Sequence, residues 1–289
     1  MKKISFLKSI IIGALFTLLS EGAFAFTACA TTGSEANRIS ETTYCYAQPD
    51  IQQVSFYKIA FCRSQPTAPT SVAAIDTSSC VTVFENTGGS TIQIQKNITV
   101  NLMGAYTRPP NGLYTHIYVE ISPAMAVQKV AYFNSSKFNT NSTSSGTKCW
   151  SLGTSSYGYQ LNDPTETSCG ADGEATTGLN LTTQYINTLD GTVGYVHTKV
   201  FPTTYGENLT AYLADSSNKL VTSGTQDGMG AITKIIGVYP QTLNITRAEL
   251  ISLIELKYGN STGVGINMSG GILFNFSPGP FDIYFAIKY

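Results

Sequence analysis

The chain has 289 residues, a formal net charge of −1 and 42% hydrophobic residues, which is enough apolar material for a sizeable core. Charged residues make up only 12% of the chain, about half of the ~25% usual for soluble domains. This balance excludes the strongly basic surface that nucleic-acid binding requires. Solubility must then rest on Ser, Thr, Asn and Gln, which suit exposed strand faces, and the length suits one large β domain.

The first 25 residues have the layout of a secretory signal peptide. Residues 1–8 hold three lysines, residues 10–19 are apolar, and residues 23–25 offer Ala at the −3 and −1 positions of a cleavage site. The apolar run is too short to span a bilayer. We therefore expect an exported protein, extracellular or on the outer cell surface, with the periplasm as an alternative. A retained membrane anchor and a lipoprotein cleaved before Cys29 are the other hypotheses.

The first strands of the mature chain are predicted from β-forming residues in period-two order. The clearest pattern is in 92–106, where apolar and polar residues alternate until Lys96 interrupts the apolar face. This stretch is therefore either one strand or two strands joined by a bend. The expected strands of this half are 54–61, 81–85, 92–106, 113–121 and 127–133.

Between 134 and 190 the strand pattern gives way to Ser, Thr, Asn and Gly. A loop of this length inside a compact domain is usually functional or disordered. It contains the only Trp of the chain, Trp150, with Tyr157 and Tyr159 nearby. If exposed, these three rings are ligand-contact candidates that stack on sugars or bury into a partner. The favoured interpretation is that Trp150 covers the neighbouring cysteine and fills a local core.

After this loop the strand signals return, except in 246–258. There Thr246 and Glu249 match a helix capping box. The turn residues at 259–263 instead indicate a hairpin between 251–258 and 264–268, and we favour this hairpin over the helix. The expected strands of this half are 193–201, 209–213 with 219–222, 232–239, 264–268, 272–276 and 281–289.

The last nine residues alternate most regularly, which gives one apolar and one polar face. The apolar face carries Phe281, Ile283, Phe285, Ile287 and Tyr289. Burying each side chain contributes roughly 1.5–3 kcal/mol, so we expect this strand to lie inside the fold and to close it. Residues 277–280 are predicted as the turn of the last hairpin. The alternative is a strand donated to a neighbouring copy.

Six cysteines in an exported chain indicate disulfides, although six allow 15 pairings. Pairing between sequence neighbours closes three short loops, each contributing roughly 3 kcal/mol by restricting the unfolded chain. No Cys-x-x-Cys is present and there are only two histidines, so a zinc site is not expected. The expected pairs are Cys29–Cys45, Cys62–Cys80 and Cys149–Cys169.

Residues 112–121, Gly-Leu-Tyr-Thr-His-Ile-Tyr-Val-Glu-Ile, place a Gly-x-Tyr turn before an alternating strand. This segment resembles the penultimate strands of prealbumin-like, immunoglobulin-type sandwiches on bacterial surfaces. The resemblance implies a sandwich and nothing about a ligand. The C-terminus, which ends in an aromatic residue, also looks like the assembly signal of outer-membrane β-barrels.

The predicted fold class is all-β. We expect residues 26–289 to form one antiparallel β-sandwich, immunoglobulin-like or jelly-roll-like, with a long disulfide-stapled loop insertion at about 134–190. An outer-membrane β-barrel is the alternative.

Catalytic and metal motifs are sparse. Residues 259–263 match the Gly-x-Ser-x-Gly of a nucleophile elbow, but a predicted strand follows them and no His comes after His197. Acidic residues gather around Cys169, and Asp163 and Asp172 are calcium candidates, although their spacing lacks the regular positions of a calcium loop. No other metal and no cofactor is expected.

These features together favour a secreted or surface-exposed β protein without catalytic activity. Low charge, disulfides and a long polar loop suit a structural or adhesion-type component that acts by contact with other surface proteins or glycans, including self-association. A secreted carbohydrate-active enzyme or carbohydrate-binding module is the alternative, and an outer-membrane barrel protein is the second alternative. A membrane partner is expected only for the barrel.

Overall fold

The computed structural model describes residues 27–32, 38–40, 43–95, 100–153, 155–157, 166–189, 196–202, 208–222, 231–246, 254–259 and 262–287. The predicted signal peptide, residues 1–25, lies outside them. Strands account for 62% of the structure, and no helix occurs in these residues. Accordingly, no helix in this part of the chain is long and apolar enough to cross a bilayer.

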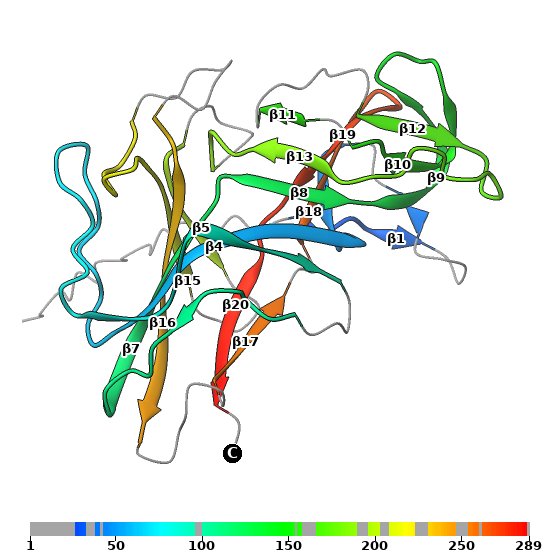
Figure 1. Ribbon diagram of the computed structural model, residues 1–289. Coiled ribbons are helices and arrows are strands. Elements are labelled where there is room, and N and C mark those ends of the chain that lie inside the picture. The colour runs from blue at the N-terminus through cyan, green and yellow to red at the C-terminus, as the bar shows by residue number, and fades with distance from the viewer. Residues whose placement is uncertain are drawn as a thin grey trace, which may run out of the picture.

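The strands form three sheets (Figure 1). The ten-stranded sheet contains β4 (Ile51–Cys62), β5 (Cys80–Ile94), β6 (Ala105–Tyr106), β7 (Gly112–Ile121), β8 (Ala124–Gln128), β11 (Ser155–Tyr157), β13 (Thr182–Tyr185), β14 (Thr198–Pro202), β15 (Asn208–Ala214) and β16 (Lys234–Ile245). The eight-stranded sheet contains β1 (Thr31–Thr32), β2 (Arg38–Ile39), β3 (Cys45–Ala47), β9 (Val130–Asn139), β10 (Ser145–Ser151), β12 (Thr167–Gly170), β18 (Val264–Ser269) and β19 (Ile272–Pro278). The third sheet is the pair β17 (Ile254–Gly259) and β20 (Asp282–Ile287).

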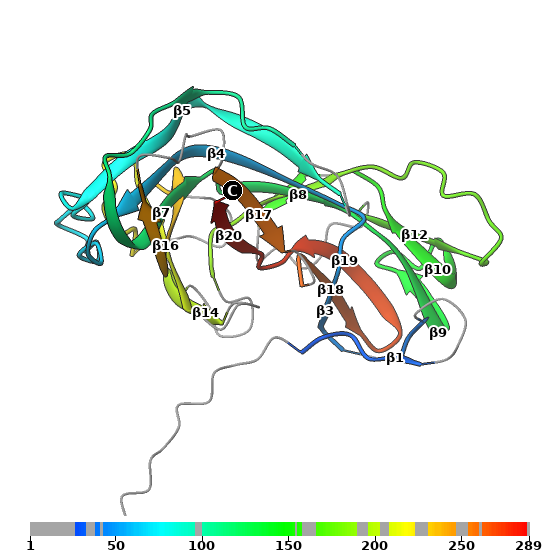
Figure 2. The ribbon, with the colours of Figure 1, turned by 90° about the horizontal axis from the view of Figure 1, so that it is seen from below.

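The sheets pack as sandwich-like layers, and none of the described sheets closes on itself. Figure 2 shows the long curved layer of β5, β4 and β8 passing over β17, β20, β18 and β19. Most strand pairs are antiparallel, with parallel pairing of β9 to β2 and β19 and of β11 to β13. The predicted antiparallel sandwich is therefore confirmed.

One nearly continuous strand path connects the two large sheets. β7 and β8 both pair antiparallel with the same strand, β4, and β9 then enters the eight-stranded sheet. The path breaks at Ser122 and Pro123, where proline has no N–H to give to a ladder. This break lets β7 pair with β16 while β8 pairs with β13.

Three apolar clusters hold the layers together. The largest lies between the inner face of the ten-stranded sheet and the β17–β20 pair, and includes Phe56, Ile117 and Phe285. A second fills the space inside the eight-stranded sheet around Phe133 and Phe276. The third lies on the outer face of β4, β7, β15 and β16. β7 is buried on both faces over Ile117–Ile121 because the first cluster covers one face and the third covers the other.

The stretch 134–190 is more regular than its composition indicates. It holds most of β9 and all of β10, β11, β12 and β13. These strands are short and polar on their exposed positions, so period-two alternation is too brief to read from sequence. The Cys149–Cys169 disulfide joins β10 to β12 at directly opposed positions.

All six cysteines pair as expected from sequence neighbours. The bonds are Cys29–Cys45, Cys62–Cys80 and Cys149–Cys169, and no cysteine is free. Cys62 and Cys80 also face each other across β4 and β5. The predicted disulfide framework is therefore confirmed.

The C-terminal strands pair differently from the sequence prediction. Residues 254–259 are a strand and not a helix, but β17 pairs with β20 and not with β18, so the predicted hairpin is wrong. The predicted last hairpin is wrong as well, because β19 pairs with β18 and β9, whereas β20 pairs with β17. The hairpin that does form joins β18 and β19 through Gly270 and Gly271, whose φ angles are 58° and 84° and match a two-residue turn with positive φ.

The terminal strand lies inside the fold, as predicted. Phe285 is only 4% exposed and its ring lies 5.3 Å from that of Phe61, whereas the neighbouring Tyr284 is 38% exposed. The Gln241 side chain bonds the backbone of Phe285 twice, accepting from its N–H at 3.0 Å and donating to its carbonyl. This amide substitutes for a neighbouring strand. Tyr289 and the side chains of Ile283 and Ile287 lie outside the described part.

Candidate binding pocket

The residues predicted as ligand contacts do not form one exposed platform among the described residues. Trp150 lies on β10, is 2% exposed, and donates its indole N–H to the carbonyl of Thr177 at 2.9 Å. Its ring therefore has no open face on which a sugar can stack. Tyr157 lies on β11, and Tyr159 is outside the described residues. The ligand-contact role of this group stays a prediction.

Of the two aspartates predicted as calcium candidates, the structure describes Asp172. Asp172 accepts a hydrogen bond from Thr147 at 2.6 Å and forms an ion pair with Arg38. These contacts, the Thr147 bond first, lower the pKa of Asp172 below its ordinary value. Asp163 lies outside the described residues. In the described ranges, no three His, Cys, Asp or Glu side chains gather closely enough to hold a metal ion.

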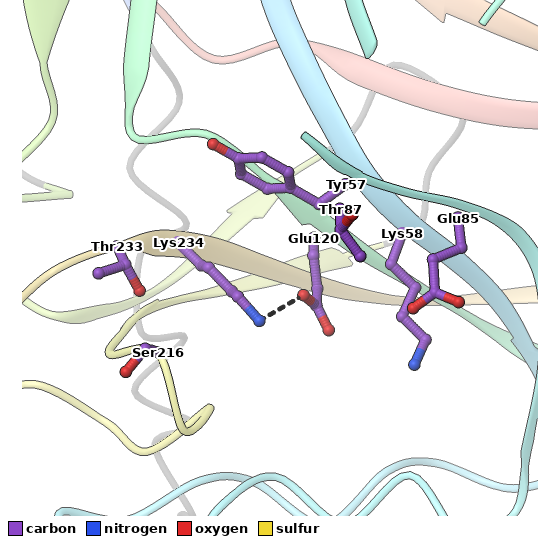
Figure 3. Close-up of a pocket in the computed structure, with 8 residues that line it drawn as sticks. All are labelled: Tyr57, Lys58, Glu85, Thr87, Glu120, Ser216, Thr233 and Lys234. Carbon is purple, nitrogen blue, oxygen red and sulfur yellow. Dashed lines mark ion pairs between the residues drawn. The ribbon is translucent and has the colours of Figure 1, made fainter. Parts of the chain in front are cut away.

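A pocket of about 360 Å³ opens on the outer face of the ten-stranded sheet. It is lined by Tyr57, Lys58, Glu85, Thr87, Glu120, Ser216, Thr233 and Lys234 (Figure 3). Register explains how residues so far apart in sequence meet. Lys58 on β4 stands opposite Glu85 on β5 and opposite Glu120 on β7, so the three side chains form a row on one face.

One wall of this pocket is formed by a β-bulge in the central strand β4. Tyr57 has no partner in the register between Phe56 and Lys58, on either side of β4, and residues 86–89 of β5 loop out opposite it. Gly89 in this loop has a φ of +82°, and a Cβ there would lie 3.0 Å from the Tyr57 ring. β-bulges of this kind bend a strand and redirect a side chain, and they are frequent next to functional sites. Here the bulge turns Tyr57 to the pocket.

Glu120 is the buried charge at the base of the pocket, only 4% exposed. It forms an ion pair with Lys234 at 2.7 Å, accepts the Tyr118 hydroxyl at 2.6 Å, and accepts the Asn218 amide at 3.4 Å. A buried carboxylate is tolerated only when it is paired and hydrogen-bonded in this way. Figure 3 shows the Lys234 ammonium reaching the Glu120 carboxylate across the pocket base.

The buried surroundings also act on Tyr118. Burial first, and then the nearby negative charge and hydrogen bond of Glu120, raise the pKa of Tyr118 well above its ordinary value. The phenol therefore stays protonated and serves as a donor to Glu120. The Tyr118 hydroxyl is therefore a fixed donor at the base of the pocket.

The rim, by contrast, has unused hydrogen-bonding groups. Lys58 forms no ion pair within the described residues. The Glu85 carboxylate and the hydroxyls of Thr87, Ser216 and Thr233 line the opening, and all four residues are exposed. Lys234 uses two of its three N–H donors on Glu120 and Asn218. Because the charges of Lys58, Lys234, Glu85 and Glu120 cancel, the pocket is polar but close to neutral.

Sequence reasoning missed this site. Glu120 offered a local signal, since it is a lone carboxylate in the strand-forming run 117–121, two residues from Tyr118 on the same face. Lys58 interrupts the run 54–61 in the same way. No local signal connects Lys234 to either residue, because the strand register alone brings them together.

Neither histidine lines the pocket, and neither do the described residues of the elbow-like motif, 259, 262 and 263. His116 contacts the Thr115 hydroxyl at 3.0 Å, and partial burial lowers the pKa of His116 and of His197. Ser261 of the motif lies outside the described residues. Comparison with protein-family models, curated proteins and solved structures finds no match to this chain.

Proposed function

We propose that this protein is an exported, non-catalytic β-sandwich that acts by contact and binds a neutral glycan in the pocket over Glu120. The observation that carries the proposal is the bulge in β4, which turns Tyr57 beside a neutral ring of donors and acceptors. Three disulfides and a leader-like N-terminus support export.

The chemistry of the pocket favours a sugar. A pyranose presents several hydroxyls that both donate and accept, and an apolar C–H face that packs on an aromatic ring. The rim supplies carboxylate, ammonium and hydroxyl groups, and Tyr57 supplies the ring. Glu85 repels a strongly acidic ligand and Lys58 repels a strongly basic one, so a neutral ligand fits best.

The fixed base of the pocket favours binding over catalysis. Glu120 already has three partners in the fold, Lys234, Tyr118 and Asn218. A general acid or base needs a proton that it can exchange with substrate, and this carboxylate is committed to holding its neighbours in place.

A glycan array carrying neutral, acidic and amino sugars tests the proposal. We expect binding to neutral glycans, and we expect Thr233→Val to weaken it about 2–10-fold through the loss of one hydrogen bond. Thr198→Val, at an exposed threonine on β14 outside the pocket, is the matched control and should bind normally. A folded protein that binds no neutral glycan, or whose Thr233→Val variant binds as the wild type does, contradicts the proposal.

A glycoside hydrolase is the second candidate, because two carboxylates line the same pocket. Glu85 and Glu120 stand on the strands that flank β4, so their backbones lie roughly 10 Å apart. Inverting enzymes separate their two carboxyl groups by roughly 6.5–9.5 Å, which side chains on strands at this spacing can reach. Incubation of the bound glycans with protein, followed by an assay for new reducing ends, separates the two candidates. Release that stops in Glu85→Gln supports the enzyme.

A further inference from the structure

A tight turn between β15 and β16 sits at the edge of the pocket. Asp215 accepts the N–H of Ser217 at 2.8 Å and that of Lys219 at 2.9 Å, and its carbonyl accepts the N–H of Asn218 at 3.1 Å. Asn218 has a φ of 62°, a left-handed conformation that costs most residues energy and that Asn tolerates. Ser216 of the same turn lines the pocket.

The Asn218 side chain bridges the ion pair beneath the pocket. Its carbonyl oxygen accepts from the Lys234 ammonium at 2.8 Å, and its amide nitrogen donates to Glu120 at 3.4 Å. A primary amide carries an acceptor oxygen and a donor nitrogen on opposite sides, so this one side chain can bridge the cation and the carboxylate. Asn218 therefore decides where the remaining N–H of Lys234 points.

The Asn218 backbone holds a second element. Its carbonyl accepts the N–H of Ile75 at 3.0 Å, and the next residues continue the contact, with the N–H of Leu220 bonding Thr70 at 3.0 Å. Ile75 and Thr70 belong to the loop 63–79, which the Cys62–Cys80 disulfide closes at its base. Ile75 is 6% exposed and packs in the outer-face cluster with Tyr118, the residue that donates to Glu120.

We propose that Asn218 is the positioning residue of the pocket and that it couples ligand binding to the disulfide-closed loop 63–79. This inference rests on the proposed function of the pocket. The side chain of Asn218 orients Lys234 toward the ligand, while its carbonyl anchors the loop at Ile75. A ligand that draws on Lys234 tightens the Asn218 turn, and the tightened turn protects the loop.

Two substitutions at Asn218 separate its side chain from its backbone. Asn218→Gly keeps the left-handed φ but removes the amide that bonds Lys234, so affinity for the neutral glycans of the array should fall about tenfold and exchange at the Ile75 amide should rise several-fold. Asn218→Ala strains the turn as well, so exchange at Ile75 should rise further than in Asn218→Gly. Ser217→Ala, at an exposed residue of the same turn whose backbone alone is used, is the control and should change neither.

A measurement without ligand tests the coupling independently of the glycan. Lys234→Met removes the donor to the Asn218 side chain, so exchange at Ile75 should rise several-fold even when no sugar is present. Unchanged exchange at Ile75 in both Lys234→Met and Asn218→Ala overturns the coupling. Wild-type affinity in Asn218→Gly overturns the positioning role. If the wild type binds no glycan, the proposed function fails, and the exchange experiment still decides the coupling.

Discussion

At the scale of single residues, the buried bond between Tyr118 and Glu120 is the most consequential contact in the pocket. Tyr118 is 1% exposed and lies 2.6 Å from the carboxylate. Tyr118→Phe removes a hydrogen bond to a charged group, so the free energy of unfolding should fall by about 1.5–3 kcal/mol. Urea denaturation at neutral pH measures this loss. Tyr106→Phe removes an exposed, uncharged hydrogen bond from a half-exposed tyrosine to the Leu102 carbonyl, so it is the control and should cost no more than about 1 kcal/mol.

Because the pKa of Tyr118 is raised, the free energy of unfolding depends on pH in the alkaline range. The pKa of Tyr118 is raised in the folded state by burial and by Glu120, while the unfolded phenol titrates near its ordinary value of about 10. The stabilising, protonated form is fully present below that pH. As the pH rises above it, the unfolded chain loses a proton that the folded chain keeps, so the free energy of unfolding falls by about 1.4 kcal/mol per pH unit for each such group. This decline should be shallower in Tyr118→Phe, and equal slopes in both proteins contradict the assignment.

At the scale of elements, the terminal strand β20 is held by one aromatic anchor. Phe285 packs against Phe61 in the largest cluster, and Tyr284 beside it faces outward. Phe285→Ala should lower the free energy of unfolding by about 3–5 kcal/mol, whereas the control Tyr284→Ala should cost less than about 1 kcal/mol. Thermal and urea unfolding measure both. A Phe285→Ala protein that melts with the wild type shows that the strand is peripheral.

The second attachment of this strand is the Gln241 amide. Gln241→Met keeps the volume but leaves the N–H and the carbonyl of Phe285 buried without a partner, at a cost of about 1–3 kcal/mol for each group. We expect faster hydrogen exchange at the Phe285 amide together with lower stability. Gln93→Met removes an exposed Gln–Gln contact on β5 and is the control. If both variants exchange alike at Phe285, the amide does not hold the strand.

At the scale of the whole molecule, two of the three disulfides link strands, one in each large sheet. Cys149–Cys169 joins β10 to β12, in a region whose strands are short. The double change Cys149→Ala and Cys169→Ala should lower the free energy of unfolding by roughly 3 kcal/mol.

Peptide mapping of the non-reduced wild type should find three disulfides between sequence neighbours. Free thiols at several of the six positions contradict this framework.

The sequence by itself determined the local features of this protein. Alternation at period two is a property of each strand alone, so the all-β class, the strands around 54–61 and 113–121, and the burial of Phe285 were predictable. The order of the six cysteines along the chain likewise predicted the disulfide pairs between sequence neighbours. A disulfide between neighbouring cysteines closes a short loop, and closing a short loop costs less chain entropy than closing a long one. The spacing of the six cysteines therefore carries this information.

Only the tertiary structure decided which strands pair and where the pocket lies. The alternation of β17 and β20 shows that each is a strand, but partner choice depends on long-range packing, so both predicted C-terminal hairpins were wrong. The pocket has the same origin. Lys58, Glu120 and Lys234 come from three strands far apart in sequence, and register alone sets them side by side. A one-residue slip of any of these strands turns its charge to the opposite face, which is why the local signals at Glu120 and Lys58 could not by themselves locate the site.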